Sequence, residues 1–300
     1  MYYNAYMAAK VCIYYITYEC DAYCEFCDNW RNEKLQEIVP APLEKHADNL
    51  KTAYSLGART IEVTGGEPLV YEQLPQFLNF AKENKLNIQL FTNGINYCDR
   101  AKEIKGLTNK IFFSLDYPLA DEHDRSRGTE CFNKAIRAIR YAKELGEKPA
   151  IIYTTTRDSL RYLPEIIEIA EKLKIELHVN PVYDFLGLEG FEKSSLDYIK
   201  YFFKRPFVKI DLAVLEMLKN KGNKTAWPRC KAKETTITYL PDGKSVVPCY
   251  FNQGGRQGKE QVCEGCTRWP YMVPSFSLGF DKYRLLHGYS QWVWEKARNS

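Results

Sequence analysis

The sequence predicts an α/β protein: a sheet of parallel strands, followed by a small cysteine-rich domain. Between residues 11 and 182, six short apolar segments with strand character alternate with five amphipathic segments of helical periodicity. Alternation with short connections favours parallel βαβ units. After residue 183 the alternation stops, and residues 227–270 are rich in Gly, Pro and Cys. The change in pattern predicts three parts, at residues 1–190, 191–226 and 227–300.

The expected strands are runs in which aliphatic, β-branched and aromatic residues dominate. The first, VCIYYIT, is apolar throughout, as is typical of strands covered on both faces. The strands are expected at residues 11–17, 59–66, 86–94, 109–116, 149–156 and 175–182.

The expected helices place apolar residues three and four positions apart and end at recognisable signals. Gly57 and Gly146 each follow the last periodic residue of a helix, a position that favours glycine. Pro75 is tolerated because it falls in the first turns of its helix. The helices between the strands are expected at residues 43–57, 71–85, 97–106, 129–146 and 160–174.

The pattern beyond residue 183 is different. Two helices are expected, at about 194–204 and 208–221, and then a hairpin in TTITYLPDGKSVVPCY (235–250). Its Pro-Asp-Gly segment is a turn signal, because Pro fixes one backbone angle and Gly tolerates the other. The aromatic-rich tail ends in a helix expected at residues 290–299.

Six βα units are too few for a complete eight-unit barrel, which leaves a partial (β/α)6 barrel or an open doubly wound sheet. In both, ligands bind where the carboxyl ends of the strands meet the loops. Four unusual loops fall at such ends: the cysteine loop at 20–27, TGGEP at 64–68, TNG at 92–94 and SLD at 114–116. Their common position predicts a binding site on one rim of the sheet.

The bulk composition excludes some classes of function. The chain has 300 residues, of which 45% are hydrophobic and 27% charged; its net charge is +4, and Lys and Glu alternate along the helices. No segment reaches the roughly 18 uninterrupted apolar residues of a membrane span. The apolar N-terminus lacks the basic start of a signal peptide and suits a buried strand better. We therefore expect a cytoplasmic protein that binds no nucleic acid.

The ten cysteines sort by position. In a reducing compartment, spaced cysteines indicate metal or redox chemistry before disulfides. Three stand alone and are interpreted as small buried hydrophobic residues: Cys12, Cys98 and Cys131. The other seven form two groups: Cys20, Cys24 and Cys27 near the start, and Cys230, Cys249, Cys263 and Cys266 near the end.

The first group has C-x3-C-x2-C spacing on the loop after the first strand. Thiolates are soft ligands suited to zinc and to iron–sulfur clusters, and ferredoxin-type clusters take four cysteines. Three thiolates would hold three irons of a [4Fe–4S] cube and leave one iron open for another ligand. An open position distinguishes a catalytic metal site from a closed structural one.

The stretch CDAYCEFC resembles the signature of the radical S-adenosylmethionine (radical SAM) enzymes, including Phe26, the aromatic residue before the third cysteine. The resemblance implies a partial (β/α)6 barrel. It also implies that S-adenosylmethionine chelates the fourth iron. One electron from the cluster would cleave the sulfonium into methionine and a 5′-deoxyadenosyl radical, which abstracts hydrogen from a substrate.

Further stretches match the same family. GGEP (65–68) resembles its strand-2 motif, and HDRSRGTECF (123–132) resembles a run found in its peptide- and small-molecule-modifying branch. Glu67 would accept from the methionyl ammonium, and Arg127 would pair with the methionyl carboxylate. His123 is interpreted as a surface loop residue without a role. The implied contacts to S-adenosylmethionine are Phe26, Gly65, Gly66, Glu67, Asn93, Ser114, Asp116 and Arg127.

The second cysteine group, C-x12-G-x5-C followed by C-x2-C, resembles the shortened Twitch form of the SPASM extension. The gap from Gly243 to Cys249 is one residue longer than usual. The resemblance implies one auxiliary [4Fe–4S] cluster with all four corners filled by protein, serving electron transfer or ordering the domain. The alternative is zinc, because C-x2-C is a common zinc half-site.

The substrate is expected to be a small or lipid-like organic molecule in a biosynthetic pathway, held in an apolar, shielded pocket under the aromatic-rich C-terminal region. A ribosomal-peptide maturase is the alternative within the family, and a flavodoxin- or ferredoxin-type protein is the expected reductant. The sequence identifies no catalytic acid or base. Two other classes stay open: a non-catalytic iron–sulfur electron carrier and a zinc-stapled binding module.

Overall fold

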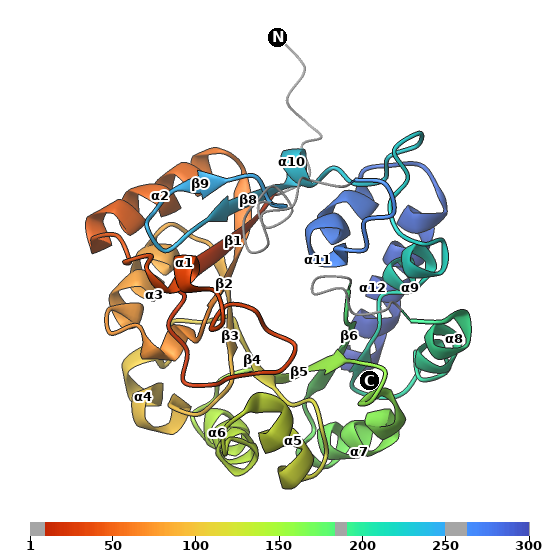
Figure 1. Ribbon diagram of the computed structural model, residues 1–300, viewed down its shortest axis with the longest axis horizontal. Coiled ribbons are helices and arrows are strands. Elements are labelled where there is room, and N and C mark those ends of the chain that lie inside the picture. Colours follow the sequence, from red (N-terminus) through yellow and green to blue (C-terminus); the bar gives the residue numbers. More distant parts are fainter. Residues whose placement is uncertain (1–9, 184–190, 250–262, 300) are drawn as a thin grey trace.

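The computed structural model describes residues 10–183, 191–249 and 263–299 and shows one mixed sheet with helices outside it (Figure 1). In the described residues the sheet has nine strands in the order β7-β6-β5-β4-β3-β2-β1-β8-β9, and all neighbours are parallel except β8 and β9. The strands are β1 (Lys10–Thr17), β2 (Ala58–Gly65), β3 (Asn87–Thr92), β4 (Lys110–Ser114), β5 (Pro149–Thr155), β6 (Glu176–Pro181), β7 (Val208–Lys209), β8 (Thr236–Tyr239) and β9 (Ser245–Val246).

Six helices that connect β1 to β6 lie on the outer side of the curved sheet (Figure 1): α2 (Leu43–Ser55), α3 (Leu74–Glu83), α4 (Tyr97–Ile104), α5 (Ala120–Arg127), α6 (Phe132–Glu144) and α7 (Leu163–Leu173). The short helix α1 (Glu33–Gln36) follows β1, and its Leu35 belongs to the same buried cluster as Ile13 and Tyr15 of β1. The later helices are α8 (Lys193–Tyr201), α9 (Leu212–Lys219), α10 (Ala232–Thr235), α11 (Trp269–Met272) and α12 (Lys282–Asn299). The sheet is open, so the predicted partial (β/α)6 barrel is confirmed.

Successive side chains of β1 point to opposite faces of the sheet, one toward the helices and one toward the lumen. Tyr14 and Ile16 belong to the main core under the helices, where Leu50 of α2 and Phe77 of α3 are also fully buried. Ile13 and its alternate neighbours face the barrel lumen instead. Each fully buried aliphatic or aromatic side chain stabilises the fold by about 1.5–3 kcal/mol, so this outer core anchors the strands whose ends carry the functional loops.

Four differences from the expected elements matter for the site. Residues 120–127 form α5, a helix that was not expected because its charged sequence has no apolar stripe. Residues 208–209 form β7, so the helix expected at 208–221 starts at Leu212. The last helix begins at Lys282 rather than at 290. The short helix α1 was not expected.

The predicted hairpin is confirmed, but it belongs to the main sheet. β8 pairs in parallel with β1, from Val11–Thr236 to Tyr14–Tyr239, and β9 pairs antiparallel with β8. The turn between them docks on α2, because Asn49 Nδ2 donates to Gly243 O (2.9 Å). The cysteine-rich region is therefore hydrogen-bonded to the first strand of the barrel.

Helices α11 and α12 occupy the side where the barrel is open, between β8 and β6 (Figure 1). The Tyr271 hydroxyl lies 3.0 Å from that of Tyr15 in β1, and Trp269 Nε1 donates to Pro181 O at the end of β6 (2.8 Å). Helix α11 thus links the first and sixth strands beside the lumen. Over the described ranges, no helix combines the length and apolar character that a membrane crossing requires.

Candidate functional site

The cysteine loop follows β1 and lies against the glycines after β2. The Gly66 N–H donates to Thr17 O (2.7 Å) and the Glu67 N–H to Glu19 O (2.8 Å). A Cβ at Gly66 would lie 2.0 Å from Glu19 O, and one at Gly65 would lie 2.1 Å from Thr17 O. Only glycine permits so close an approach, which explains the pair in physical terms.

Helix α5 holds the other side of the cysteine loop. The Tyr23 N–H donates to Arg127 O (2.9 Å) and the Glu25 N–H to Ser126 O (3.0 Å). The Ser126 hydroxyl donates to Glu25 Oε1 (2.8 Å). Gly128 ends the helix with φ of 65°, and a Cβ there would lie 2.8 Å from Tyr23 O. The loop is therefore fixed by main-chain bonds on two sides.

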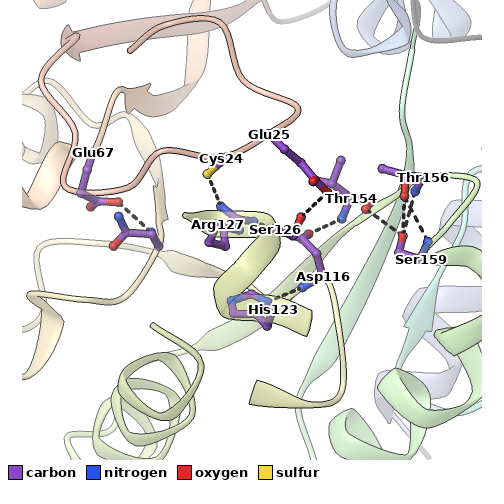
Figure 2. A network of polar contacts seen from close by, with 11 residues as sticks. Cys24, Glu25, Glu67, Asp116, His123, Ser126, Arg127, Thr154, Thr156 and Ser159 are labelled. Carbon is purple, nitrogen blue, oxygen red and sulfur yellow. Dashed lines mark hydrogen bonds and ion pairs between the residues drawn. The ribbon is translucent and has the colours of Figure 1, made fainter. Parts of the chain in front are cut away.

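Arg127 is the centre of the polar network at this rim (Figure 2). Its guanidinium forms an ion pair with Asp116, donates to Cys24 Sγ (3.6 Å) and lies 5.2 Å from the Phe26 ring centroid. Burial alone would lower the pKa of Arg127, but Asp116 and the nearby thiols raise it overall. Among the described residues, its buried Nε has no hydrogen-bond partner. One donor is thus left over at the cysteine loop.

Asp116 is itself fixed from two directions (Figure 2). Its Oδ1 accepts from the Thr154 N–H (2.9 Å), and its own N–H donates to His123 Nδ1 (3.2 Å). The interpretation of His123 as a surface loop residue is wrong, because α5 buries it completely. Burial, helped by Arg127, lowers its pKa to about 3, which keeps the ring neutral and Nδ1 able to accept. His123 is one turn before Arg127 on the same helix.

Glu67 turns its carboxylate toward the end of β3. Oε2 accepts from the Asn93 N–H (2.7 Å), and Oε1 accepts from the Thr92 hydroxyl (2.7 Å) and the Leu69 N–H (3.0 Å). Burial raises the pKa of Glu67 to about 7, against the lowering effect of these donors. Its contacts in the structure are therefore within the chain, and they shape the TNG turn.

Asp21, which the sequence did not single out, connects the cysteine loop to the same turn. Its two oxygens accept from Asn93 Nδ2 (2.6 Å) and Asn96 Nδ2 (2.7 Å). Ser114 ends β4, half-buried and paired with Ile152 of β5, two residues before Asp116. The structure therefore brings all the expected contact residues to one rim.

The three thiols of the loop fit a metal cluster in their chemistry. Burial raises the pKa of Cys20 to about 12 and also raises that of Cys24. A buried thiol gives up its proton readily only beside a cation, and a bound metal supplies one. Within the described ranges, no three His, Cys, Asp or Glu side chains converge on a single ion. A cube does not need this, since each cysteine binds a different iron.

The second cysteine group is gathered by Asn223. Its Oδ1 accepts from the Cys230 N–H (3.0 Å), its N–H donates to Cys266 O (2.8 Å), and its Nδ2 donates to Cys263 O (3.1 Å). Burial, together with the neighbouring cysteines, raises the pKa of Cys230, Cys249 and Cys266. The preceding Gly222 leaves no room for a side chain, because a Cβ would lie 2.4 Å from Gly265 O.

A cavity of about 1060 Å³ lies in the barrel lumen. Part of the wall of this cavity is aromatic, and another part carries charged and polar side chains. The aromatic wall includes Tyr15, Phe91, Phe112, Trp269 and Tyr271, and the charged wall includes Glu62, Lys110, His178 and Lys209. The sequence predicted an apolar pocket, but the lumen of the structure is only partly apolar.

Residues 14–170 match the Radical SAM superfamily. The AdoMet-dependent heme synthase of Oleidesulfovibrio alaskensis is 28% identical over 171 residues, 55% of this chain and 43% of that protein. The probable GTP 3′,8-cyclase of Sulfolobus acidocaldarius is 26% identical over 257 residues, 78% of this chain and 79% of that protein. The chain thus spans less than half the length of the heme synthase.

Two solved structures share the fold. SuiB of Streptococcus suis, bound to the precursor peptide SuiA, superposes with a TM-score of 0.68 at 17% identity, over 94% of this chain and 65% of SuiB. AdoMet-bound anSMEcpe gives a TM-score of 0.61 at 15% identity, over 93% and 83% of the two chains. With the matched half of the sequence and the open barrel, these findings identify the chain as a radical SAM superfamily enzyme, a class that uses a [4Fe–4S] cluster and S-adenosylmethionine.

Proposed function

We propose that this chain holds a [4Fe–4S] cluster on Cys20, Cys24 and Cys27, cleaves S-adenosylmethionine with one electron and abstracts hydrogen from a small organic substrate. When bound, the cluster supplies that electron to the sulfonium. The observation that supports this most directly is the double fixation of the cysteine loop, by the glycines after β2 and by α5. A loop held so firmly presents three thiols in a constant arrangement, as an open-iron site requires.

The network around Arg127 suggests how S-adenosylmethionine is oriented. The buried Nε of Arg127 is a donor without a partner among the described residues, and a methionyl carboxylate would satisfy it. The close packing of Gly65 and Gly66 on the cysteine loop lets main-chain groups approach a ligand. Phe26, Asn93, Ser114 and Asp116 border the same rim and remain proposed contacts.

The decisive test is anaerobic reconstitution with iron and sulfide, followed by dithionite and S-adenosylmethionine, with 5′-deoxyadenosine as the readout. Cys24→Ala should abolish its formation, because the cluster loses one of three ligands. Cys98→Ala is the matched control; this half-buried cysteine lies on α4, beside Arg137, and should retain activity. Equal 5′-deoxyadenosine formation by both variants would refute the proposal.

We assign Cys230, Cys249, Cys263 and Cys266 to one auxiliary [4Fe–4S] cluster. The support is the attachment of Cys230, Cys263 and Cys266 to Asn223, the electrostatic effect of Cys249 on the Cys230 and Cys266 thiols, and the contact of Gly222 with the CEGC segment. Metal analysis should then give about eight irons per chain, four for each cluster. About four irons with one zinc would favour the structural zinc alternative.

Helix α11 bridges β1 and β6 across part of the opening of the lumen, which favours a small molecule over a peptide. The charged wall of the lumen favours a polar compound over a lipid-like one. GTP is the first compound to test, since the cyclase relative named for it matches 78% of this chain. Transfer of deuterium from a labelled substrate into 5′-deoxyadenosine would identify the true one. A flavodoxin- or ferredoxin-type protein is the proposed reductant.

A further inference from the structure

Glu62 is a carboxyl group in the lumen without an internal partner. It lies in the middle of β2, between Ile61 and Val63, which are fully buried on the helix side, so its side chain points to the opposite face. Within residues 10–183, 191–249 and 263–299 the Glu62 carboxyl group makes no hydrogen bond or ion pair. A half-buried carboxyl without partners is costly for a fold, so its presence calls for a ligand.

The opposite wall carries a cationic cluster. Glu176 Oε2 accepts from Lys110, from Lys209 Nζ (2.9 Å) and from His178 Nε2 (3.1 Å). Burial lowers the pKa of His178 to about 4, so this ring is neutral near pH 7. Both ammonium groups contact the same carboxylate oxygen, so the two lysines lie side by side on this wall. The Lys110 and Lys209 side chains remain about 20% exposed, toward the cavity.

Strand register places the two charged features on one level of the lumen. Glu62 pairs with Gln89, and Gln89 pairs with Lys110, so two strand spacings separate Glu62 from Lys110. At about 4.8 Å for each spacing, their backbones lie roughly 10 Å apart. The uncharged Gln89 lies between them. A molecule that contacts both Glu62 and Lys110 would need a positively charged and a negatively charged group a few bonds apart.

We propose that the lumen is a two-ended subsite for a zwitterionic small molecule, an amino acid or an amino-acid-like compound. Glu62 binds its ammonium group, and Lys110 and Lys209 bind its carboxylate. Burial raises the pKa of Glu62 to about 7, so an arriving cation would draw it into the charged form. This inference rests on the proposed function, because it describes the substrate of the same site.

A series of ω-amino acids, from 4-aminobutyrate to 8-aminooctanoate, can measure the spacing. Binding to the reconstituted protein would be followed by saturation-transfer NMR and compared with the alkanoate and the alkylamine of equal length. One chain length should bind about tenfold more tightly than its alkanoate, as expected for one added charge-assisted bond. Zwitterions that bind no better than either single-ended compound, at every length, would overturn the inference.

Variants test which residues bind the ammonium group and which bind the carboxylate of the ligand. Glu62→Gln should remove the tenfold preference for the amino acid and leave alkanoate binding unchanged. Lys209→Gln should weaken the alkanoate and the amino acid alike. Glu83→Gln, an exposed glutamate on α3, is the matched control and should change neither. If Glu62→Gln leaves the preference intact, Glu62 does not bind the ammonium.

The outcome can be separated from that of the proposed function. Without substrate, the dithionite-driven formation of 5′-deoxyadenosine depends on the rim, and it is measured in the wild-type protein and in the exposed control Glu83→Gln. If the wild-type protein forms none, the radical proposal fails, whatever the lumen binds. If it forms 5′-deoxyadenosine and the chain-length series shows no preference, the lumen inference alone fails.

Discussion

Glu62 lies within β2, and Glu67 lies five residues further on, just after the strand ends. Burial raises the pKa of each glutamate to about 7. Glu67, at the rim, accepts three hydrogen bonds from the turn around Asn93. Glu62, in the lumen, accepts none within the described residues. A raised pKa therefore reports burial and not a role. Partners within the chain make one carboxyl structural, and their absence leaves the other for a ligand.

The same contrast extends to the regions around them. At the rim, Asp116, Arg127 and His123 are joined to one another by an ion pair and a hydrogen bond, and Asp116 also accepts from the Thr154 N–H (Figure 2). In the lumen, charges are separated by a cavity of about 1060 Å³. The rim is organised before any ligand arrives, as a site for a constant cofactor should be. The charged groups of the lumen are not joined in this way before a ligand binds, as suits the part of the enzyme that selects a substrate.

The largest expected effect comes from removing the structural carboxyl. Glu67→Ala leaves the N–H groups of Leu69 and Asn93 and the Thr92 hydroxyl without their acceptor. Each buried unpaired group costs about 1–3 kcal/mol, so the free energy of unfolding should fall by about 3 kcal/mol or more. Urea denaturation monitored by circular dichroism measures this.

Glu72→Ala is the matched control for that variant, because Glu72 is exposed a few residues further along the chain. Its free energy of unfolding should stay within about 0.5 kcal/mol of the wild type. If Glu67→Ala proves equally stable, the distinction drawn between the two glutamates is wrong at the rim.

The next expected effect is that of Glu62→Gln on the free energy of unfolding. It is smaller, and it stabilises the protein instead of destabilising it. A carboxyl with a raised pKa holds its proton more tightly in the folded state, so stability is complete below the ordinary pKa of 4.5 and is lost as pH rises through about 7. Glu62→Gln cannot ionise. Its free energy of unfolding should equal that of the wild type near pH 4.5 and exceed it by about 2 kcal/mol at pH 8.

Glu67 titrates in the same window, so the informative quantity is the difference between Glu62→Gln and the wild type at each pH. Thermal melts from pH 4.5 to pH 8 provide it. In the exposed control Glu83→Gln this difference should not vary with pH. Parallel curves for Glu62→Gln and the wild type would show that Glu62 is paired in solution.

The fold was predictable because the spacing of apolar residues in strands and helices can be read from the sequence without knowing any tertiary contact. The strands and main helices carry strong apolar patterns, and the rim loops follow from strand polarity. Helix α5 was missed because ADEHDRSR has no apolar stripe. Its signals were electrostatic: acidic residues in the first turn, Arg125 and Arg127 in the last, and Gly128 as the left-handed cap.

The polar partners were less accessible to sequence reasoning. Asp21 and Asn93 are 72 positions apart, and no local pattern joins them. The inward side of Glu62 was visible in the alternation of RTIEVTGG, but what it faces depends on chain that lies far away. Lys209 and α11 line the same lumen, although they lie far from Glu62 along the chain. Local rules fix the direction of a side chain, and tertiary structure fixes its environment.

The smallest expected effect tests whether the rim network acts on the cluster site itself. Arg127 donates to Cys24 Sγ (3.6 Å), and hydrogen bonds to ligand sulfur raise the reduction potential of an iron–sulfur cluster. Arg127→Lys keeps the positive charge beside Asp116 but cannot reproduce the planar fork. The midpoint potential of the cluster on the first cysteine loop should fall by roughly 30–60 mV, or about 1 kcal/mol for one electron.

A redox titration followed by electron paramagnetic resonance measures the potential directly and does not depend on turnover. Arg125→Lys is the matched control, because Arg125 is exposed on the same helix and should leave the potential unchanged. Glu62→Gln should also leave it unchanged, since Glu62 faces the lumen below the rim. If Glu62→Gln shifts the potential as far as Arg127→Lys does, rim and lumen form one electrostatic unit, and the division between a preformed cofactor site and a ligand-dependent substrate site fails.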